Sequence, residues 1–296
     1  MGEKIGVVVV NYASHRLIQQ NLGDLTDADL RIVVVDNFCS DRERLEVAAL
    51  AESRGWTWVP NPNSGFGGGA NTGVATALAE GCGAVVVVNP DLEIDAPSVR
   101  RLAAEALDHP MTIVAPLVLG RDGLPWGQLG YVDVEQGRIR SKGGSAADLS
   151  WVSGACLALS ADTWTQLGGF SCDYFMYWED VDLSVRCQRA GGSVMLLEDV
   201  TVTHAVGGTQ GEGRSRLYYF YNCRNRLLFA AKHLSRRQRL RWLAQTPADL
   251  RRVARRDAGL SRWNRAMRAL PPCLSGVAAG AGLMIAAALR HEGPSR

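Results

Sequence analysis

The sequence predicts an α/β protein with a mostly parallel central sheet, helices on both faces of that sheet, and a helical, basic C-terminal extension. Three patterns in its 296 residues lead to this prediction. Nearly continuous runs of Val and Ile are typical of strands covered on both faces, as they are in parallel sheets. Segments of helical length alternate with these runs, and such alternation builds a doubly wound layer. Toward the C-terminus the pattern becomes helical and rich in arginine.

The first 119 residues alternate regularly between strands and helices. Strands are expected at 5–10, 31–35, 57–59, 84–88 and 111–119. Helices are expected between them, at 16–25, 42–54, 68–80 and 97–107. Pro97 suits the first turn of the last helix, because a backbone donor is not needed there.

Residues 120–213 are less regular. A loop or hairpin insertion is expected at 125–144 and an apolar segment at 151–159. A helix is expected at 181–190, followed by two short strands at 194–197 and 200–204. Gly191 and Gly192 are expected to end the helix, as glycines commonly do. From Arg216 onward the pattern is helical.

Charge is unevenly distributed along the chain. Residues 214–268 carry 16 Lys and Arg against Asp249 and Asp257, whereas residues 1–213 carry 14 Lys and Arg against 27 Asp and Glu. A basic stretch can bind nucleic acid. Residues 1–213 are acidic, however, and offer no second basic surface along which a phosphate backbone could bind, so no nucleic-acid partner is expected. Residues 271–289 are weakly polar, yet Ala and Gly dominate them, which favours a packed or interfacial helix over a membrane span.

Cysteine content and the N-terminus indicate the compartment. The seven cysteines are odd in number and form no C-x-x-C pair, which argues against a zinc site and a disulfide framework. Free thiols suit a reducing compartment, and the N-terminal apolar run is too short for a signal peptide. The expected location is cytoplasmic, with peripheral contact at the inner face of the plasma membrane through the basic extension.

Polar residues follow three of the expected strands, and a glycine-rich segment follows another. In an open parallel sheet, ligands bind beyond the carboxyl ends of the strands, and glycines let the backbone approach a phosphate at a helix start. Asn89-Pro90-Asp91 alone could be an ordinary turn, but several such ends on one rim predict a nucleotide site. The residues assigned to it are Asn11, Tyr12, Asp36, Asn37, Asn63, Gly65, Phe66, Gly67, Asn71, Asn89 and Asp91.

A dinucleotide site is the competing interpretation. Gly65, Gly67 and Ala70 have the spacing of the loose dinucleotide fingerprint, and Asp36 ends the second strand as the fingerprint requires. However, the fingerprint belongs after the first strand, and here the glycines follow the third. This order argues against a hydride-transfer enzyme.

Two further groups of residues suggest chemistry. Aromatic residues lead into Glu179 and Asp180 at a helix start, where acidic side chains are also common because they suit the helix dipole; the functional interpretation makes Asp180 a general base. His204 follows a short strand, and a lone histidine there is usually structural. Together with Asp91, however, it would supply ligands suited to a divalent ion.

Taken together, these motifs resemble glycosyltransferase family 2, which has the GT-A fold, and most closely its bacterial rhamnosyltransferase-like branch. The matching segments keep the family's order over about residues 5–230. In the family the metal motif is Asp-x-Asp; here Asn89 replaces the first Asp, and Asp91 carries the charge. The segments are Asn11-Tyr12, Asp36-Asn37 with Ser40 and Asp41, 63–73, Asn89-Pro90-Asp91, Gly168-Gly169-Phe170, 178–183, 204–207 and 218–225.

The resemblance implies a Rossmann-like GT-A catalytic domain at 1–213 and a helical extension at 214–296 packed on or beside it. The nucleotide-binding half would cover about 1–119 and the acceptor-binding half about 120–213. The implied reaction is the inverting transfer of a sugar from a nucleoside diphosphate sugar to an acceptor hydroxyl.

The resemblance also implies individual roles. Asp180, with Glu179 beside it, would provide the catalytic base, and Asp91 and His204 would hold Mg²⁺ or Mn²⁺ on the donor diphosphate. Asp36 would accept a hydrogen bond from a pyrimidine edge, while Asn11, Tyr12 and Asn71 would help to seat the nucleoside. The residues expected on the acceptor side are Trp151, Gly154 and Trp178.

The substrates follow from the same resemblance. A dTDP-L-rhamnose-like donor is expected first and a UDP-hexose second, and the acceptor is expected to be a glycan, a lipid-linked sugar or a natural-product scaffold. Two alternatives stay open: another nucleotide-binding enzyme such as a nucleotidyltransferase, and an inactive nucleotide-sugar-binding protein. The intact Trp178-Glu179-Asp180 sequence and His204 favour an active glycosyltransferase.

Residues 214–268 are expected to dock weakly on an anionic membrane surface. Tryptophans such as Trp242 and Trp263 would lie at the headgroup level, while arginines such as Arg255 and Arg256 would contact phosphates. A solvated helical face is the alternative interpretation of the same pattern.

Overall fold

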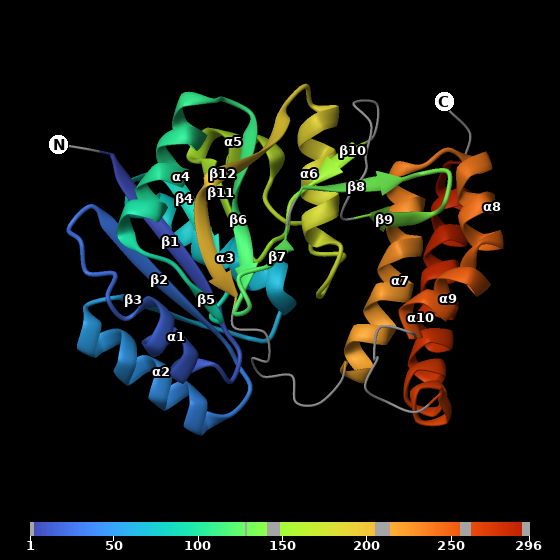
Figure 1. Ribbon diagram of the computed structural model, residues 1–296, viewed down its shortest axis with the longest axis horizontal. Coiled ribbons are helices and arrows are strands. Elements are labelled where there is room, and N and C mark those ends of the chain that lie inside the picture. The colour runs from blue at the N-terminus through green and yellow to red at the C-terminus, as the bar shows by residue number, and fades with distance from the viewer. Residues whose placement is uncertain (1–2, 128, 141–148, 205–213, 255–261, 292–296) are drawn as a thin grey trace.

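A computed structural model describes residues 3–127, 129–140, 149–204, 214–254 and 262–291. Its centre is a mixed sheet flanked by helices, and the C-terminal helices form a bundle at one end (Figure 1). A short strand, β7 (Pro125–Gly127), pairs with β6 beside the main path of the sheet. Along that path the strand order is β3 (Thr57–Asn61), β2 (Leu30–Asn37), β1 (Lys4–Asn11), β4 (Cys82–Val88), β11 (Cys156–Ser160), β6 (Thr112–Gly120), β12 (Ser193–His204) and β5 (Leu92–Glu93).

The pairing of the strands brings the predicted polar strand ends together. β1 pairs in parallel with β2 and β4, and β2 pairs in parallel with β3. In this register Asn11 lies beside Asp36, and Asn37 lies beside Asn61. β4 ends at Val88, level with Val9 of β1. The residues that follow these strands therefore meet at one edge of the sheet, as the α/β prediction requires.

Helices cover both faces of the sheet, which confirms the predicted layers. The valines of β1 point alternately to the two faces, so Val7 and Val9 join one core cluster while Val8 and Val10 join the other. On the first face lie α1 (His15–Leu22), α2 (Asp41–Arg54) and α4 (Ala96–Asp108). On the second face lie α3 (Gly65–Ala79), α5 (Ala161–Leu167) and α6 (Glu179–Arg189).

Local sequence explains where the helices begin and how closely they pack. Ser40 and Asp95 cap α2 and α4 by accepting hydrogen bonds from backbone N–H groups of Glu43 and Ser98. The glycine-rich helix α3 lies close to the sheet because Gly73 has no side chain: a Cβ there would come within 2.4 Å of Val8. This close approach seats the start of α3 at the edge where the strands end.

The second half contains elements that the sequence analysis did not resolve. The insertion expected at 125–144 contains β7, β8 (Gly130–Asp133) and β9 (Arg138–Arg140). Together with β10 (Leu149–Trp151), which follows the insertion, β8 and β9 form a small antiparallel sheet with β8 in the middle. The apolar segment expected at 151–159 contributes β11, which runs antiparallel between β4 and β6. The two strands expected at 194–204 are one strand, β12, with an irregularity between Leu197 and Thr201.

The C-terminal extension packs on the α/β part of the chain. It comprises α7 (Arg216–His233), α8 (Arg236–Ala244), α9 (Thr246–Ala254) and α10 (Arg262–His291). One buried cluster unites Leu227, Phe229 and Trp242 of the extension with Tyr174 and Val181 near α6. α10 runs along α7, and Gly276 permits the contact because a Cβ there would lie 2.3 Å from the Phe220 carbonyl oxygen. The expected domain boundary at 213/214 adjoins residues 205–213, which lie outside the described residues.

Candidate active site

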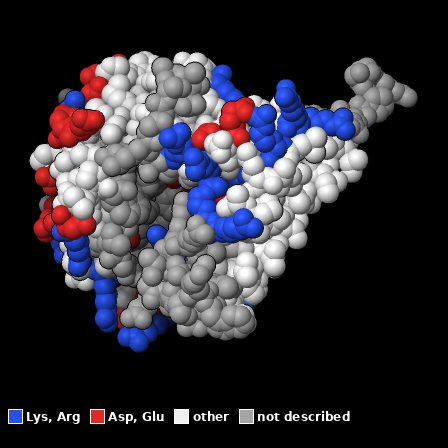
Figure 2. Space-filling view, turned by 45° about the vertical axis from the view of Figure 1, so that its right-hand side comes forward, with Lys and Arg blue, Asp and Glu red and all other residues white. Residues whose placement is uncertain are grey.

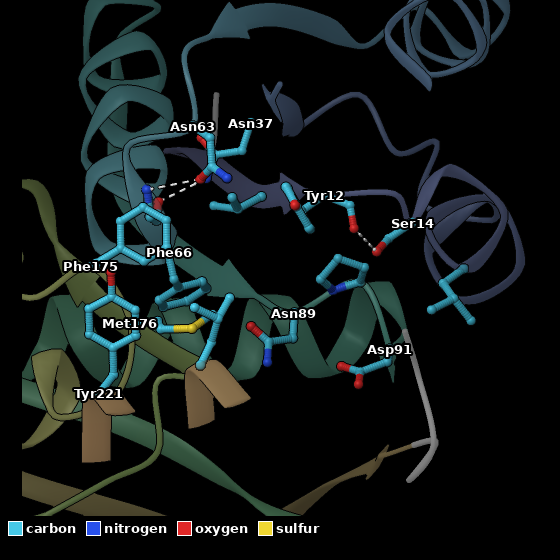
Figure 3. A pocket seen from close by; sticks show the side chains of 15 residues that line it. Tyr12, Ser14, Asn37, Asn63, Phe66, Asn89, Asp91, Phe175, Met176 and Tyr221 are labelled. Carbon is cyan, nitrogen blue, oxygen red and sulfur yellow. Dashed lines mark hydrogen bonds between the residues drawn. The ribbon is translucent and has the colours of Figure 1, made fainter. Parts of the chain in front are cut away.

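A cavity of about 410 Å³ opens at the carboxyl ends of the parallel strands. Figure 3 shows Tyr12 and Asp91 on one side of this cavity and Phe175, Met176 and Tyr221 on the other. The position agrees with the rule for ligand sites in open α/β sheets. The lining comprises Val10, Tyr12, Ser14, Leu17, Asn37, Asn63, Gly65, Phe66, Asn89, Pro90, Asp91, Phe175, Met176, Leu217 and Tyr221.

The glycine-rich segment forms a rigid wall of the cavity. Gly65 has a left-handed backbone (φ 80°), and a Cβ there would lie 1.9 Å from the carbonyl oxygen of Phe175, so only glycine fits. The Asn37 side chain donates to the Gly65 carbonyl at 2.8 Å and accepts from Asn61 at 2.6 Å. The backbone N–H of Phe66 donates to Phe175 at 2.9 Å. The start of α3 is therefore held between β2 and the segment that precedes α6.

Two predicted nucleotide residues, Asn11 and Asp36, are buried and lie outside the cavity lining. Asp36 is fully buried, and its carboxylate accepts a hydrogen bond from Arg44 Nε at 2.8 Å. The amide nitrogen of Asn11 lies 3.4 Å from the same carboxylate, while the Asn11 oxygen accepts from Ser14 N at 3.0 Å. Neither side chain belongs to the lining. A contact between Asp36 and a pyrimidine stays a prediction, and it would require Arg44 to share or release that carboxylate.

Asn71 and Gly67 lie away from the cavity lining. The side chain of Asn71 makes a reciprocal pair with the backbone of Phe170, accepting from its N–H at 2.9 Å and donating to its carbonyl at 2.8 Å. Gly67 faces the Phe170 side chain, where a Cβ would come within 3.0 Å. Both residues join α3 to the segment around Phe170, and the nucleoside contact expected of Asn71 stays a prediction.

Asp91 and His204 come together because β5 pairs with β12. This antiparallel pairing sets His204 beside Leu92, the residue after Asp91. His204 Nε2 lies 3.4 Å from an Asp91 carboxylate oxygen, so the predicted juxtaposition is present. Burial lowers the pKa of His204, although Asp91 opposes the shift. The neutral imidazole that this favours is the form that binds metal ions.

The Asp91–His204 pair fits a divalent ion that the substrate also ligates. A carboxylate oxygen and an imidazole nitrogen 3.4 Å apart can both contact one ion at the usual distance of about 2.1 Å. Within the described residues, no group of three or more His, Cys, Asp and Glu side chains could hold a metal ion. The remaining ligands would therefore come from a substrate such as a diphosphate, from water, or from amide oxygens of the chain.

Asp180 sits at the start of α6, beside the cavity wall. Its carboxylate accepts hydrogen bonds from the backbone N–H of Gly154 at 3.0 Å and of Val181 at 2.8 Å. A Cβ on Gly154 would lie 3.3 Å from the Phe66 ring and 3.4 Å from Asp180 Cβ, so the three residues adjoin. Burial raises the pKa of Asp180, and the backbone donors only partly oppose this. A carboxylate with a raised pKa suits a general base.

Glu179 occupies a different environment from its neighbour. Its side chain is buried, and Oε2 has no hydrogen-bond partner among the described residues. Burial, and secondarily the nearby Asp180, hold the pKa of Glu179 well above its usual range. The protonated form of Glu179 is thereby favoured, which makes Asp180 the better candidate for the base.

Two sequence models of known families match the chain. The model described as Glycosyl transferase family 2 matches residues 7–144, which contain the glycine-rich wall and Asp91. The model described as Glycosyl transferase family group 2 matches residues 133–287, which contain Asp180 and His204. The chain belongs to glycosyltransferase family 2.

Individual relatives of this glycosyltransferase agree with that result. It is 25% identical over 291 residues to an N-acetylglucosaminyl-diphospho-decaprenol L-rhamnosyltransferase of Mycobacterium tuberculosis, covering 85% of this chain and 92% of that protein. It is 27% identical over 240 residues to a low-salt glycan biosynthesis hexosyltransferase of Haloferax volcanii, covering 77% and 76%. The predicted resemblance to the rhamnosyltransferase-like branch is thus confirmed.

The fold comparison also agrees. The glycosyltransferase superposes on a mannosyltransferase of Pyrobaculum calidifontis, solved with GDP-Man and Mn²⁺, with a TM-score of 0.56 and 17% identity over 98% of this chain and 87% of the other. The predicted GT-A fold is therefore confirmed.

The two tryptophans expected on the acceptor side of this glycosyltransferase pack toward the extension. Trp178 is buried, and its ring packs against Phe229 at 5.5 Å and Trp242 at 6.3 Å between ring centres. Trp151 is half-buried and packs against the same cluster. Trp178 therefore joins α6 to the extension, and an acceptor-side role for the two tryptophans stays a prediction. Of the three expected acceptor-side residues, Gly154 is the one that contacts Asp180.

The glycosyltransferase also has cavity residues that the sequence analysis did not assign. Leu217 and Tyr221 come from α7 and lie one turn apart on the face that meets the cavity. Tyr221 stacks on Phe175, with ring centres 5.3 Å apart and an angle of 19° between the planes. The spacing of Leu217 and Tyr221 predicts a helix face, but nothing near them in the sequence indicates the cavity, whose other lining residues all precede residue 177. The extension therefore contributes an apolar wall to the site.

Proposed function

We propose that this glycosyltransferase transfers a sugar, with inversion, from a nucleoside diphosphate sugar to an acceptor hydroxyl, with Asp180 as the base. The observation that carries the proposal is that Asp180 adjoins Gly154 and the Phe66 wall of a cavity that Asp91 also lines, with His204 next to Asp91. Inversion requires a base on one face of the sugar and a stabilised leaving group on the other. The backbone connects the two sides closely, because Asn89 N–H donates to the carbonyl of Ala155, next to Gly154, at 2.8 Å.

The base side of the reaction depends on residues of this chain. Asp180, when ionised, accepts the proton of the acceptor hydroxyl as that oxygen bonds to the anomeric carbon and the bond to the diphosphate breaks. The backbone N–H groups of Gly154 and Val181 fix the direction of its carboxylate. Glu179, favoured in its protonated form, adds little repulsion against the ionised base.

The leaving-group side depends on Asp91 and His204. These residues would hold Mg²⁺ or Mn²⁺, and the bound ion would offset the negative charge on the departing diphosphate. The Mn²⁺ in the solved mannosyltransferase supports this proposal. Tyr12, which is 51% exposed, and the amide of Asn63 at the rim would meet the nucleoside.

For the substrates, we propose a dTDP-L-rhamnose-like donor first and a UDP-hexose second. The support is the similarity to an L-rhamnosyltransferase that covers 92% of that protein. The same relative supports a lipid-linked sugar as the acceptor class, ahead of a free glycan or a natural-product scaffold.

A donor screen tests the proposed function. The protein is incubated with dTDP-L-rhamnose, UDP-hexoses and GDP-mannose in Mg²⁺ or Mn²⁺, and release of the nucleoside diphosphate is followed. We expect turnover of one donor class to exceed that of the others and to require Asp180. Binding of the nucleotide sugars without any turnover would indicate an inactive binding protein. Release of pyrophosphate from a sugar phosphate and a nucleoside triphosphate would indicate a nucleotidyltransferase.

We also propose that the extension contacts an anionic membrane surface. Figure 2 shows Lys and Arg side chains gathered along a border of the extension, next to a broad surface without charged residues. The exposed arginines Arg236, Arg237 and Arg251 belong to 214–268. Trp242, in contrast, is fully buried and cannot reach headgroups as expected from its sequence context. Arg255 and Arg256, and the side chain of Trp263, lie outside the described part of the chain.

The apolar part of this contact is proposed to come from α10. Its segment Met267–Leu289 is long and apolar enough to cross a membrane by length and composition alone. One face of α10 packs on α7, and the other exposes large apolar side chains at helical spacing. This arrangement supports in-plane contact rather than a span. The exposed side chains are Met267, Leu270, Leu274, Ile285 and Leu289.

Co-sedimentation with liposomes tests the membrane contact. We expect sedimentation to require anionic lipid and to decrease as salt rises. Membrane affinity should weaken by about 100-fold when Arg236, Arg237 and Arg251 become Gln, at roughly 1 kcal/mol per arginine. Replacing three exposed arginines of the catalytic part, Arg16, Arg42 and Arg121, is the matched control and should have a smaller effect. Absence of sedimentation with anionic liposomes at low salt would remove the membrane contact and leave the proposed transfer reaction intact.

A further inference from the structure

The turn that leads into Asp180 has an unusual backbone. Tyr177 and Trp178, the two residues before Glu179, both have left-handed conformations, with φ of 65° and 75°. This conformation is uncommon for residues with a Cβ, and for bulky ones it persists where surrounding contacts hold it in place. Aromatic side chains do not favour the turn themselves. The contacts that hold it must therefore come from elsewhere in the chain.

Asn225 of α7 supplies such contacts. It is fully buried, and its side-chain nitrogen donates to the carbonyl oxygens of Met176 at 2.9 Å and Tyr177 at 2.8 Å. Its side-chain oxygen accepts from Arg224 at 2.5 Å. Both N–H groups of the amide are thus directed at two consecutive carbonyls of the turn. A carboxylate of the same shape would have no hydrogen to donate to them.

His233, the last residue of α7, holds α6 just beyond Asp180. Its Nε2 lies 2.7 Å from the carboxylate of Asp182, which is fully buried. Its Nδ1 lies 3.0 Å from Arg189, whose guanidinium can only donate, so Nδ1 accepts and the ring proton sits on Nε2. His233 therefore donates to Asp182. Arg186 donates to the second carboxylate oxygen at 2.7 Å, which completes the network.

We propose that Asn225 and His233 are positioning residues that fix the base Asp180 from the side opposite the substrate. Asn225 holds the backbone at 176–177, and His233 holds the side chain of Asp182, so α7 is attached on both sides of residue 180. Neither side chain belongs to the cavity lining. The C-terminal extension is on this account a structural part of the catalytic centre. The inference rests on the proposed role of Asp180.

The expected consequence of losing either attachment is a misplaced base. A shift of about 1 Å in a catalytic group can lower turnover by about 100-fold without loss of binding. Donor binding should be retained, because Tyr12, Asn37 and Asp91 are held by the sheet, and because the two substitutions leave the α7 side chains that line the cavity in place. The signature is therefore a fall in kcat with donor KM little changed.

The experiment compares four variants in the hydrolysis or transfer of dTDP-L-rhamnose with Mn²⁺. Asn225→Asp and His233→Leu should each lower kcat by about 100-fold and change donor KM by less than about threefold. Asn222→Asp is the matched control, because Asn222 donates to Tyr218 within its own helix at 2.9 Å, and it should stay near wild type. His233→Gln, which can still donate from a nitrogen near the Nε2 position, should recover most of the activity lost in His233→Leu.

Thermal unfolding of each variant separates positioning from general loss of structure. If Asn225→Asp fails to fold, the comparison of His233→Gln with His233→Leu decides the question. Folded variants with wild-type kcat, or variants whose kcat and donor affinity fall together, would overturn the inference. Asp180→Asn in the same assay tests the base role of Asp180 separately from the positioning roles. If Asp180→Asn is inactive while the Asn225 and His233 variants are fully active, this inference alone is overturned. If Asp180→Asn is fully active, the proposed base itself is wrong.

Discussion

Asp180→Asn is expected to lower turnover by about two to four orders of magnitude, the usual contribution of a general base, while donor binding stays nearly intact. An amide cannot accept the hydroxyl proton, but it has nearly the same shape as the carboxylate. The amide oxygen could still accept a hydrogen bond from one of the two backbone N–H groups, of Gly154 or Val181, that now donate to the carboxylate, so the local structure should persist. Calorimetry with the nucleoside diphosphate and steady-state rates on the same preparation provide the measurement.

Glu179→Gln is the matched control for this substitution. Because burial raises the pKa of Glu179 and favours its protonated form, a neutral amide resembles the side chain that is already there. We expect this variant to retain turnover within about one order of magnitude, well above Asp180→Asn. The raised pKa of Asp180 further predicts that wild-type turnover falls as the pH drops through that pKa, since protonation abolishes the base. Wild-type turnover in Asp180→Asn would refute the assignment.

Asp91→Ala and His204→Ala are each expected to weaken binding of the nucleoside diphosphate by about tenfold to a hundredfold in Mg²⁺ or Mn²⁺. Each substitution removes one of the two side chains that lie 3.4 Å apart at the cavity edge. In EDTA the variants and the wild type should bind alike, because no ion is then present to connect protein and diphosphate. Calorimetric titration in both conditions gives the comparison.

Glu93→Ala provides the control for the loss of a nearby acidic side chain. Glu93 lies two residues after Asp91 on β5, and its side chain is exposed outside the cavity lining. We expect its replacement to leave binding unchanged in either condition. Equal binding by the wild-type protein with and without a divalent ion would contradict the metal role of Asp91 and His204, and would leave Asp91 as the cap of a turn.

The parallel part of the sheet could be predicted because its valines are buried on both faces. Val7 and Val8 point to opposite sides of β1, yet helices cover both, so the apolar run is continuous in sequence. The antiparallel direction of β11 could not be predicted. It lies between β4 and β6 and is also covered on both faces, so its sequence resembles that of a parallel strand.

The site was predictable where its residues follow strands, and not where it depends on distant contacts. Asn37, Asn89 and Asp91 reach the cavity because the register of β1, β2 and β4 places their strand ends together. The left-handed turn at Tyr177 could not be predicted, because its own sequence disfavours it and its partner, Asn225, is 48 residues further along the chain. The burial of Trp178 has the same origin in the packing of the extension.

The stereochemistry of sugar release tests the central claim most directly. With the donor identified by the screen, water takes the place of the acceptor, and time-resolved proton NMR observes the sugar before its anomers interconvert. The account predicts that the first sugar formed has the anomeric configuration opposite to that of the donor, and that its formation is lost in Asp180→Asn. A first product with the donor's own configuration would contradict direct displacement by a hydroxyl activated at Asp180.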